Sequence, residues 1–206
     1  MPDPGSSSTA VAPPASDSAT LAVRKAVMAD IPQLLRLING YASEGIMLPR
    51  TEFEISENLR DFSVIHCGEL VVGCAALHIY TPTMGEVRSL AVDAAFHGSG
   101  AGRMLMDALE AEAQSFGLQS LFAFTYIPAF FAKFGYTEIE REAVPLKAWK
   151  DCLRCAKFQC CDEIAVIKHL NVEHSRVSDT HMEGVATFPQ VLPEDPVLLP
   201  SIRKSH

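Results

Sequence analysis

Hydrophobic positions change their spacing within one stretch of the chain, residues 85–116. Residues 87–92 (VRSLAV) place apolar side chains close together with no breaker, as a buried strand does. The next apolar positions recur at helical spacing on one face: Leu105, Leu109, Ala113 and Phe116. Gly117 follows, where a left-handed residue commonly ends a helix. The pattern predicts a strand, a loop and an amphipathic helix.

The residues before this stretch predict a strand, two helices and a hairpin. A strand at 22–27 precedes a helix with Asp30 as its N-cap and Pro32 in its first turn. Gly40 is expected to end that helix, and a shorter helix runs to about Leu59. The hairpin strands are residues 62–66 and 70–80. Downstream, residues 121–125 (LFAFT) predict a short apolar strand, and residues 128–140 (PAFFAKFGYTEIE) a helix followed by a strand.

Three glycines, Gly98, Gly100 and Gly102, alternate with Ser99 and Ala101 between the strand and the helix of residues 85–116. Glycine lets the backbone approach a ligand closely, and a helix N-terminus adds unpaired N–H donors and a positive dipole end. This predicts an anion cradle, best suited to a diphosphate. The alternative is a tight turn that binds nothing. The spacing GxGxG excludes both GxxxxGK[ST] and GxGxxG.

The stretch resembles motif A of the GNAT N-acetyltransferases, [QR]xxGxG[AG] after a strand. Gly100 and Gly102 match, while His97 stands where the family usually has Gln or Arg. The resemblance implies that loop amides bind the pyrophosphate of acetyl-CoA. It also implies the GNAT fold, an α/β (α+β) domain whose mixed, mostly antiparallel sheet is flanked by helices and splays in a V at the acetyl-CoA site.

The downstream segment 128–140 is similar to the GNAT pattern [FY]YxKxGF. Where many members carry a tyrosine that protonates the departing thiolate, this chain has Phe131. The candidates are therefore Tyr126, a water, or departure of the unprotonated thiolate. The resemblance implies these acetyl-CoA-binding residues: Leu90, Ala91, Val92, His97, Gly98, Ser99, Gly100, Ala101, Gly102, Arg103, Phe130 and Lys133.

Three strings resemble the short, stand-alone N-acetylglutamate synthases: MLPRT (47–51), GEVRSLAV (85–92) and residues 146–167. The resemblance implies acetylation of the α-amine of L-glutamate, the first step of arginine biosynthesis. Glu86 resembles the acidic residue that accepts the amine proton in many members. Candidates for binding glutamate are Arg50, Arg88, Ser89, Arg154 and Lys157. The alternatives are another amine acceptor, such as a polyamine, an antibiotic or a peptide N-terminus, or a non-catalytic acetyl-CoA sensor.

Composition adds limits to this picture. The chain of 206 residues is 48% hydrophobic, enough for one compact domain, and its net charge of −8 disfavours nucleic-acid and membrane-surface binding. No apolar run is long enough to span a membrane, and the N-terminus lacks a secretory pattern, so we expect a cytoplasmic protein. We expect a low-complexity tail (1–20), the acetyltransferase domain (21–170) and a proline-containing extension (171–206). The extension could lie across the domain, contact a partner in a homodimer, or be disordered.

Four of the six cysteines fall within ten residues, in the pattern C-x2-C-x4-C-C. A C-x2-C pair is a good half of a zinc site, but adjacent cysteines rarely bind one ion together. We therefore predict no metal and expect reduced thiols beside the substrate loop. Zinc at Cys152, Cys155 and Cys161 is the alternative.

Overall fold

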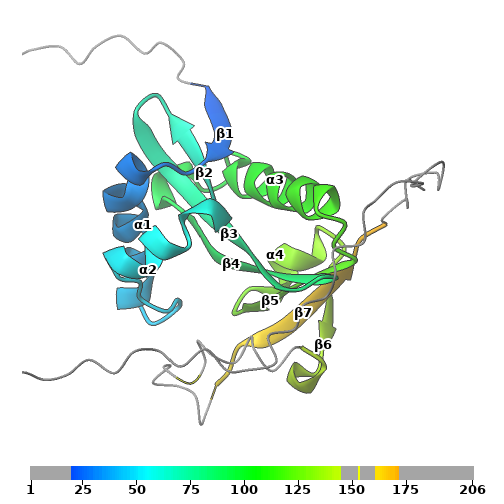
Figure 1. Ribbon diagram of the computed structural model, residues 1–206. Coiled ribbons are helices and arrows are strands. Elements are labelled where there is room, and N and C mark those ends of the chain that lie inside the picture. Colours follow the sequence, from blue (N-terminus) through cyan, green and yellow to red (C-terminus); the bar gives the residue numbers. More distant parts are fainter. Residues whose placement is uncertain (1–19, 145–152, 154–160, 172–206) are drawn as a thin grey trace, which may run out of the picture. The chain divides into compact units, whose positions relative to one another are not determined.

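The computed structural model describes residues 20–144, 153 and 161–171. Its centre is a seven-stranded sheet with the order β1-β2-β3-β4-β5-β7-β6 (Figure 1). The strands are β1 (Leu21–Lys25), β2 (Phe62–Cys67), β3 (Leu70–Thr81), β4 (Met84–Val92), β5 (Ser120–Thr125), β6 (Thr137–Ile139) and β7 (Ile164–His169). All neighbouring strands are antiparallel except β4 and β5, which run parallel. The predicted mixed, mostly antiparallel sheet is confirmed.

Helices cover both faces of this sheet (Figure 1). The α-helices are α1 (Ile31–Ser43), α2 (Glu52–Glu57), α3 (Ala101–Ser115) and α4 (Pro128–Ala132). Short 3-10 helices are η1 (Met28–Asp30), η2 (Leu59–Asp61), η3 (Ala94–Phe96) and η4 (Arg141–Ala143). One apolar cluster joins α1 and α2 to β2, β3 and β4, and a second joins α3 and α4 to the sheet. Alternating strand side chains thus supply both layers.

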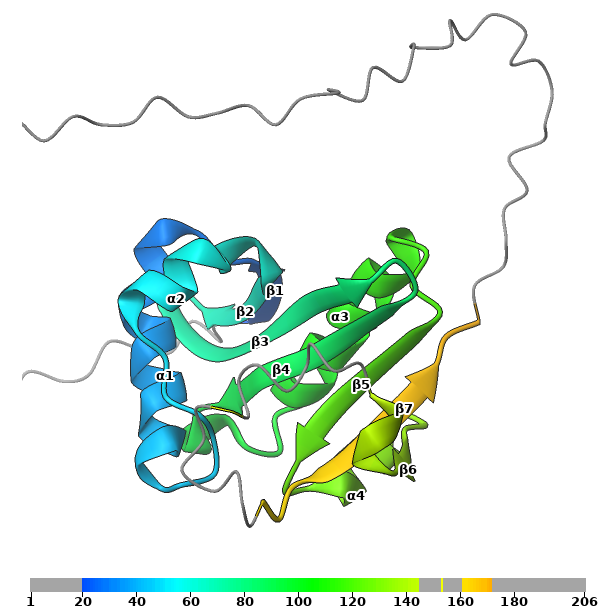
Figure 2. The same ribbon diagram turned by 60° about the horizontal axis from the view of Figure 1, so that its bottom comes forward.

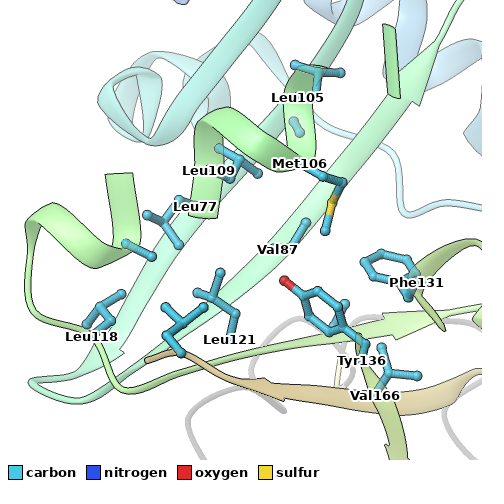
Figure 3. Close-up of a cluster of buried hydrophobic side chains, with 14 of the residues drawn as sticks. Leu77, Val87, Leu105, Met106, Leu109, Leu118, Leu121, Phe131, Tyr136 and Val166 are labelled. Carbon is cyan, nitrogen blue, oxygen red and sulfur yellow. The ribbon is translucent and has the colours of Figure 1, made fainter. Parts of the chain in front are cut away.

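The core beneath α3 follows the predicted helical stripe (Figure 3). The α3 side chains Leu105, Met106 and Leu109 pack on buried side chains of the strands, among them Leu77, Val87 and Leu121. Phe116 is the exception to the prediction, because its side chain is 57% exposed. The helix ends at Ser115, and Phe116 is its C-cap before a left-handed Gly117 (φ +73°). A residue past the last turn leaves the stripe.

The start of α1 agrees with the sequence, but its end does not. Asp30 is the N-cap residue, yet its carboxylate accepts hydrogen bonds from the Arg24 guanidinium (2.6 and 2.9 Å) and the Val27 N–H (2.8 Å). The hydrogen bond with Arg24 is the main reason that the pKa of Asp30 is lowered. The helix continues through Gly40 to Ser43. Glycine inside a helix costs only about 1 kcal/mol, so the predicted end at Gly40 was wrong.

Strands β4 and β5 separate along their length (Figure 2). They pair only where Met84–Glu86 faces Ser120–Phe122, and both then continue without pairing to each other. This is the predicted V-shaped splay. It leaves an opening in the sheet between the carboxyl ends of the two strands.

Candidate active site

A cavity of about 560 Å³ lies at this opening. It is lined by segments far apart in the sequence: the end of α1 and the loop after it, β4, the start of α3, and the residues around the ends of β5 and α4. Most of the site residues predicted from the sequence line it: Arg50, Glu86, Arg88, Ser89, Leu90, Ala91, Val92, His97, Gly98, Gly100, Ala101, Gly102, Tyr126 and Phe130. The fold therefore brings residues of the predicted acetyl-CoA-binding, glutamate-binding and catalytic sets to one cavity, while their chemical roles stay predictions.

The loop before α3 and the first turn of that helix, residues 98–103, form what we call the glycine cradle, of which Gly98, Gly100, Ala101 and Gly102 line the cavity. Gly98 (φ +78°) and Gly100 (φ +92°) have left-handed backbones, which side chains other than glycine rarely adopt. The N–H of Met104 donates to the carbonyl of Gly100 (3.0 Å) and closes the first turn of the helix. The N–H groups of Gly102 and Arg103 precede it and have no helical carbonyl to bond. The 15-residue helix α3 thus directs free donors and its positive end toward the cavity, as a diphosphate requires.

Strand β4 carries a bulge where it borders the cavity. Arg88 pairs with Ala76 and Ala91 with Cys74, so the two residues between them, Ser89 and Leu90, face only one residue of β3. Ser89 has a left-handed backbone (φ +53°), which places its peptide outside the regular ladder. The Cys74 thiol lies 3.6 Å from the Ser89 carbonyl oxygen and donates to it. Burial raises the pKa of Cys74 to about 12, so the thiol keeps its proton.

Tyr41 of α1 joins the end of β4 to the loop before the cradle. Its hydroxyl donates to the Val92 carbonyl oxygen (2.5 Å) and lies 3.0 Å from Nε2 of His97, which is itself 3.0 Å from that oxygen. A carbonyl oxygen only accepts, so Nε2 carries a hydrogen. Burial, followed by Glu44 and Asp93, raises the pKa of Tyr41 and keeps the hydroxyl protonated. Tyr41 was not predicted, because its bonds to Val92 and His97 form only in the fold.

Three charged side chains that line the cavity, Arg50, Glu86 and Arg88, form what we call the charged wall. Arg50 lies just before α2, in a segment whose backbone is firmly held. The Asn39 side chain bonds both polar groups of the Arg50 backbone, at 2.8 and 2.9 Å. Thr51, the next residue, opens α2 with a capping box to Glu54.

Glu86 and Arg88 of β4 have partners on neighbouring elements. Glu86 is only 8% exposed, and its Oε2 accepts a hydrogen bond from the Tyr80 hydroxyl (3.0 Å). Arg88 lies inside an otherwise apolar stretch of β4. Its guanidinium lies 3.6 Å from Oδ2 of Asp61. His78 Nδ1 lies 2.6 Å from the same oxygen, so Asp61 connects the two side chains.

At position 131, in α4, the cavity is lined by a phenylalanine ring and not by the hydroxyl of a tyrosine. Phe131 is 4% exposed and packs edge-on against Phe130 and Tyr136. It cannot donate a proton. Tyr126, half-buried at the end of β5, lines the cavity and can. Glu163, just before β7, lines the cavity as well; nothing in its sequence context singled it out.

Several predicted residues are not brought to the cavity. Ser99, Arg103 and Lys133 are exposed and do not line it. The Arg103 guanidinium lies over the Phe134 ring instead, 5.0 Å from its centroid. Two predicted glutamate-binding residues and two residues of the alternative zinc site lie outside the described residues: Arg154, Lys157, Cys152 and Cys155.

Cys161, the third candidate zinc ligand, has protein partners. Its Sγ accepts a hydrogen bond from the Arg141 guanidinium (2.8 Å) and lies 3.7 Å from a Glu163 carboxylate oxygen. Within residues 20–144, 153 and 161–171, no three His, Cys, Asp or Glu side chains are grouped so that they could hold a metal ion. In the same part of the chain, no helix has both the length and the apolar character needed to cross a membrane.

Comparisons with known proteins point to one family. Residues 33–136 match the acetyltransferase (GNAT) family. An uncharacterized N-acetyltransferase of Chlorobaculum tepidum is 43% identical over 157 residues, which cover 76% of this chain and 99% of the relative. An amino-acid acetyltransferase of Mycobacterium tuberculosis is 36% identical over 135 residues, covering 64% and 77%. N-acetylglutamate synthase from Neisseria gonorrhoeae, complexed with coenzyme A and N-acetyl-glutamate, has a TM-score of 0.68 at 25% identity, covering 75% of this chain and 36% of that one.

Proposed function

The chain belongs to the acetyltransferase (GNAT) family, with acetyl-CoA as its co-substrate, and from this premise we propose that it acetylates the α-amine of L-glutamate. The observation that carries the proposal is the charged wall. Two arginines and a buried carboxylate line the same cavity as the glycine cradle. The amino-acid acetyltransferase of M. tuberculosis and the N-acetylglutamate synthase of N. gonorrhoeae support the choice of an amino acid as acceptor.

Glutamate brings two carboxylates to the reaction. Arginine matches a carboxylate with two parallel N–H donors, and charge-assisted pairs of this kind are stronger than neutral hydrogen bonds. In our proposal Arg50 binds one carboxylate and Arg88, held by Asp61, borders the other. Ser89 at the bulge adds a hydroxyl beside them.

The reaction is a direct transfer. Glu86 accepts a proton from the ammonium group, directly or through a water, and the freed amine attacks the acetyl carbonyl carbon. The new C–N bond forms, the nitrogen gives up its second proton to water, and the C–S bond to CoA breaks. A backbone N–H of the bulged strand, near Leu90, donates to the oxygen that becomes negative in between. Tyr126 or water then protonates the thiolate, or the thiolate leaves unprotonated.

The glycine cradle holds the diphosphate of acetyl-CoA in this proposal. Its donors are backbone N–H groups, so His97 in place of Gln or Arg changes little. Gly102 also lets the first turn of α3 lie close to the Phe130 ring, because a Cβ at this position would be only 3.3 Å from that ring.

A thiol-release assay with acetyl-CoA and a panel of amines tests the proposal. The panel contains glutamate, glutamine, aspartate, a polyamine, an aminoglycoside and a peptide N-terminus. We expect the highest kcat/KM with glutamate. The highest value with a different amine would replace the acceptor and keep the acetyltransferase. Acetyl-CoA binding without any turnover would favour the second candidate, a non-catalytic sensor, which the buried Phe131 makes worth testing.

The proposal also covers the pathway, the cellular location and the organisation of the chain. We place the step at the start of arginine biosynthesis and in the cytoplasm. The division into a low-complexity segment (1–20), a domain (21–170) and an extension (171–206) is part of it, as is a homodimer.

A further inference from the structure

The segment between α1 and α2 forms part of the cavity without being a helix or a strand. Four of its residues line the cavity: Ile46, Met47, Leu48 and Arg50. A segment of this kind has many backbone conformations, and the position of its arginine varies with them. Something outside the segment must therefore fix the backbone of Arg50 if its guanidinium is to meet a substrate at one place.

Asn39 is the residue that does so. It lies on α1, one turn before the helix ends, and its side chain bonds the Arg50 backbone twice. Its Nδ2 donates to the Arg50 carbonyl oxygen (2.9 Å), and the Arg50 N–H donates to its Oδ1 (2.8 Å). A side-chain amide has a donor and an acceptor on one planar group, so it bonds a peptide in both directions, as a neighbouring strand would. Alanine, leucine or serine cannot do this.

We propose that Asn39 is a positioning residue that presents Arg50 to the acceptor, an inference that rests on the proposed function. Asn39 itself does not line the cavity. It acts through the backbone of Arg50, while the capping box of Thr51 and Glu54 holds the segment on the other side. The two hydrogen bonds between the Asn39 side chain and the Arg50 backbone, which we call the clamp, therefore contribute to acceptor binding and not to the chemical step.

Steady-state kinetics of Asn39→Ala and Asn39→Leu, each alone and combined with Arg50→Ala, test this role. Losing the two bonds should raise the KM for glutamate about three- to tenfold, with kcat and the KM for acetyl-CoA close to wild type. In the Arg50→Ala background the same change should add less than about twofold, because the guanidinium it positions is gone. Ser43→Ala, which removes a local bond to Gly40 at the end of α1, is the matched control.

Amide hydrogen exchange gives a second measurement that needs no activity. The Arg50 amide should exchange faster in both Asn39 variants and at the wild-type rate in Ser43→Ala. Leucine keeps the branched shape and the number of heavy atoms of the side chain, so Asn39→Leu serves if the alanine variant does not fold.

Three results would overturn the inference. An unchanged KM for glutamate in the Asn39 variants, with a raised KM in Arg50→Ala, removes the positioning role and leaves the proposed function intact. Equal effects of the Asn39 change with and without Arg50 mean that Asn39 acts by another route. An unchanged KM in Arg50→Ala removes Arg50 from the acceptor site, and the positioning role is lost with it.

Discussion

The glycine cradle and the charged wall border one cavity but are built in opposite ways. The cradle presents backbone N–H groups, and its sequence requirement is conformational: Gly98 and Gly100 need left-handed backbones. The charged wall presents side chains, and a residue of another element accompanies each one: Asn39 with Arg50, Asp61 with Arg88 and Tyr80 with Glu86.

This difference separates the two substrates. A site made of backbone amides accepts the same diphosphate whatever side chains surround it, so the cradle suits a co-substrate shared by a whole family. A site made of positioned side chains changes its ligand when one side chain changes. Variants of the cradle should therefore alter acetyl-CoA binding, and variants of the charged wall should alter the amine.

The largest expected effect is on chemistry, through Glu86→Gln. Glutamine keeps the shape but cannot accept the proton, and general base catalysis contributes about a hundred- to ten-thousandfold to a rate. We expect kcat to fall by such a factor at neutral pH, with acetyl-CoA affinity unchanged. The loss should be greatest at low pH, where the amine is protonated, and smaller as the pH approaches the pKa of the amine. Glu112→Gln, on the surface beside Lys25, is the control. A wild-type pH–rate profile in Glu86→Gln would remove Glu86 from the mechanism.

Gly100→Val tests the glycine cradle, the other region in this comparison. Valine at φ +92° is strained by about 1–3 kcal/mol, and its side chain projects into the space that the diphosphate needs. We expect acetyl-CoA affinity, measured by calorimetry, to fall about a hundredfold.

Gly117→Val is a close control for this change. Gly117 has a similar backbone (φ +73°) and equally open surroundings, but it lies at the far end of α3. It should lose comparable stability in denaturant unfolding and keep its acetyl-CoA affinity. Equal acetyl-CoA affinity in the two variants would mean that the loop is only a turn.

The same contrast explains what the sequence could predict. The cradle was predictable because its strand, glycines and helix are contiguous, so local spacing carries the whole signal. The clamp on Arg50 and the bond from Tyr41 to Val92 were not, since they join residues 11 and 51 positions apart. Local spacing in one sequence does not show which distant residues become neighbours in the fold.

The errors in the fold have equally local causes. Gly40 was given too much weight as a helix end, although α1 tolerates it at a modest cost. Phe116 fitted the helical spacing, but the helix ended one residue earlier. Periodicity finds an element more reliably than its last residue, and packing decides the rest.

Arg50→Ala tests whether the charged wall binds the acceptor. A partly buried arginine–carboxylate pair contributes about 1.5–3 kcal/mol, or about ten- to a hundredfold in binding. The KM for glutamate should rise by that factor while the KM for acetyl-CoA stays nearly unchanged. Arg50→Lys should recover only part of the loss, because an ammonium cannot make the two parallel bonds. Arg60→Ala, an exposed arginine of η2, should match wild type. An unchanged KM for glutamate in Arg50→Ala would remove residues 47–51 from the acceptor pocket.

Tyr41→Phe has the smallest expected effect and tests how the α1 side of the cavity supports the cradle. The change removes only the hydroxyl that bonds the Val92 carbonyl and lies beside His97. One hydrogen bond of this kind is worth about 0.5–1.5 kcal/mol, so the KM for acetyl-CoA should rise about three- to tenfold and the KM for glutamate less. Tyr80→Phe removes the hydroxyl that bonds Glu86 and should instead alter the pH dependence of kcat. Equal rises in both KM values for Tyr41→Phe would show that the hydroxyl supports the whole cavity and not the cradle in particular.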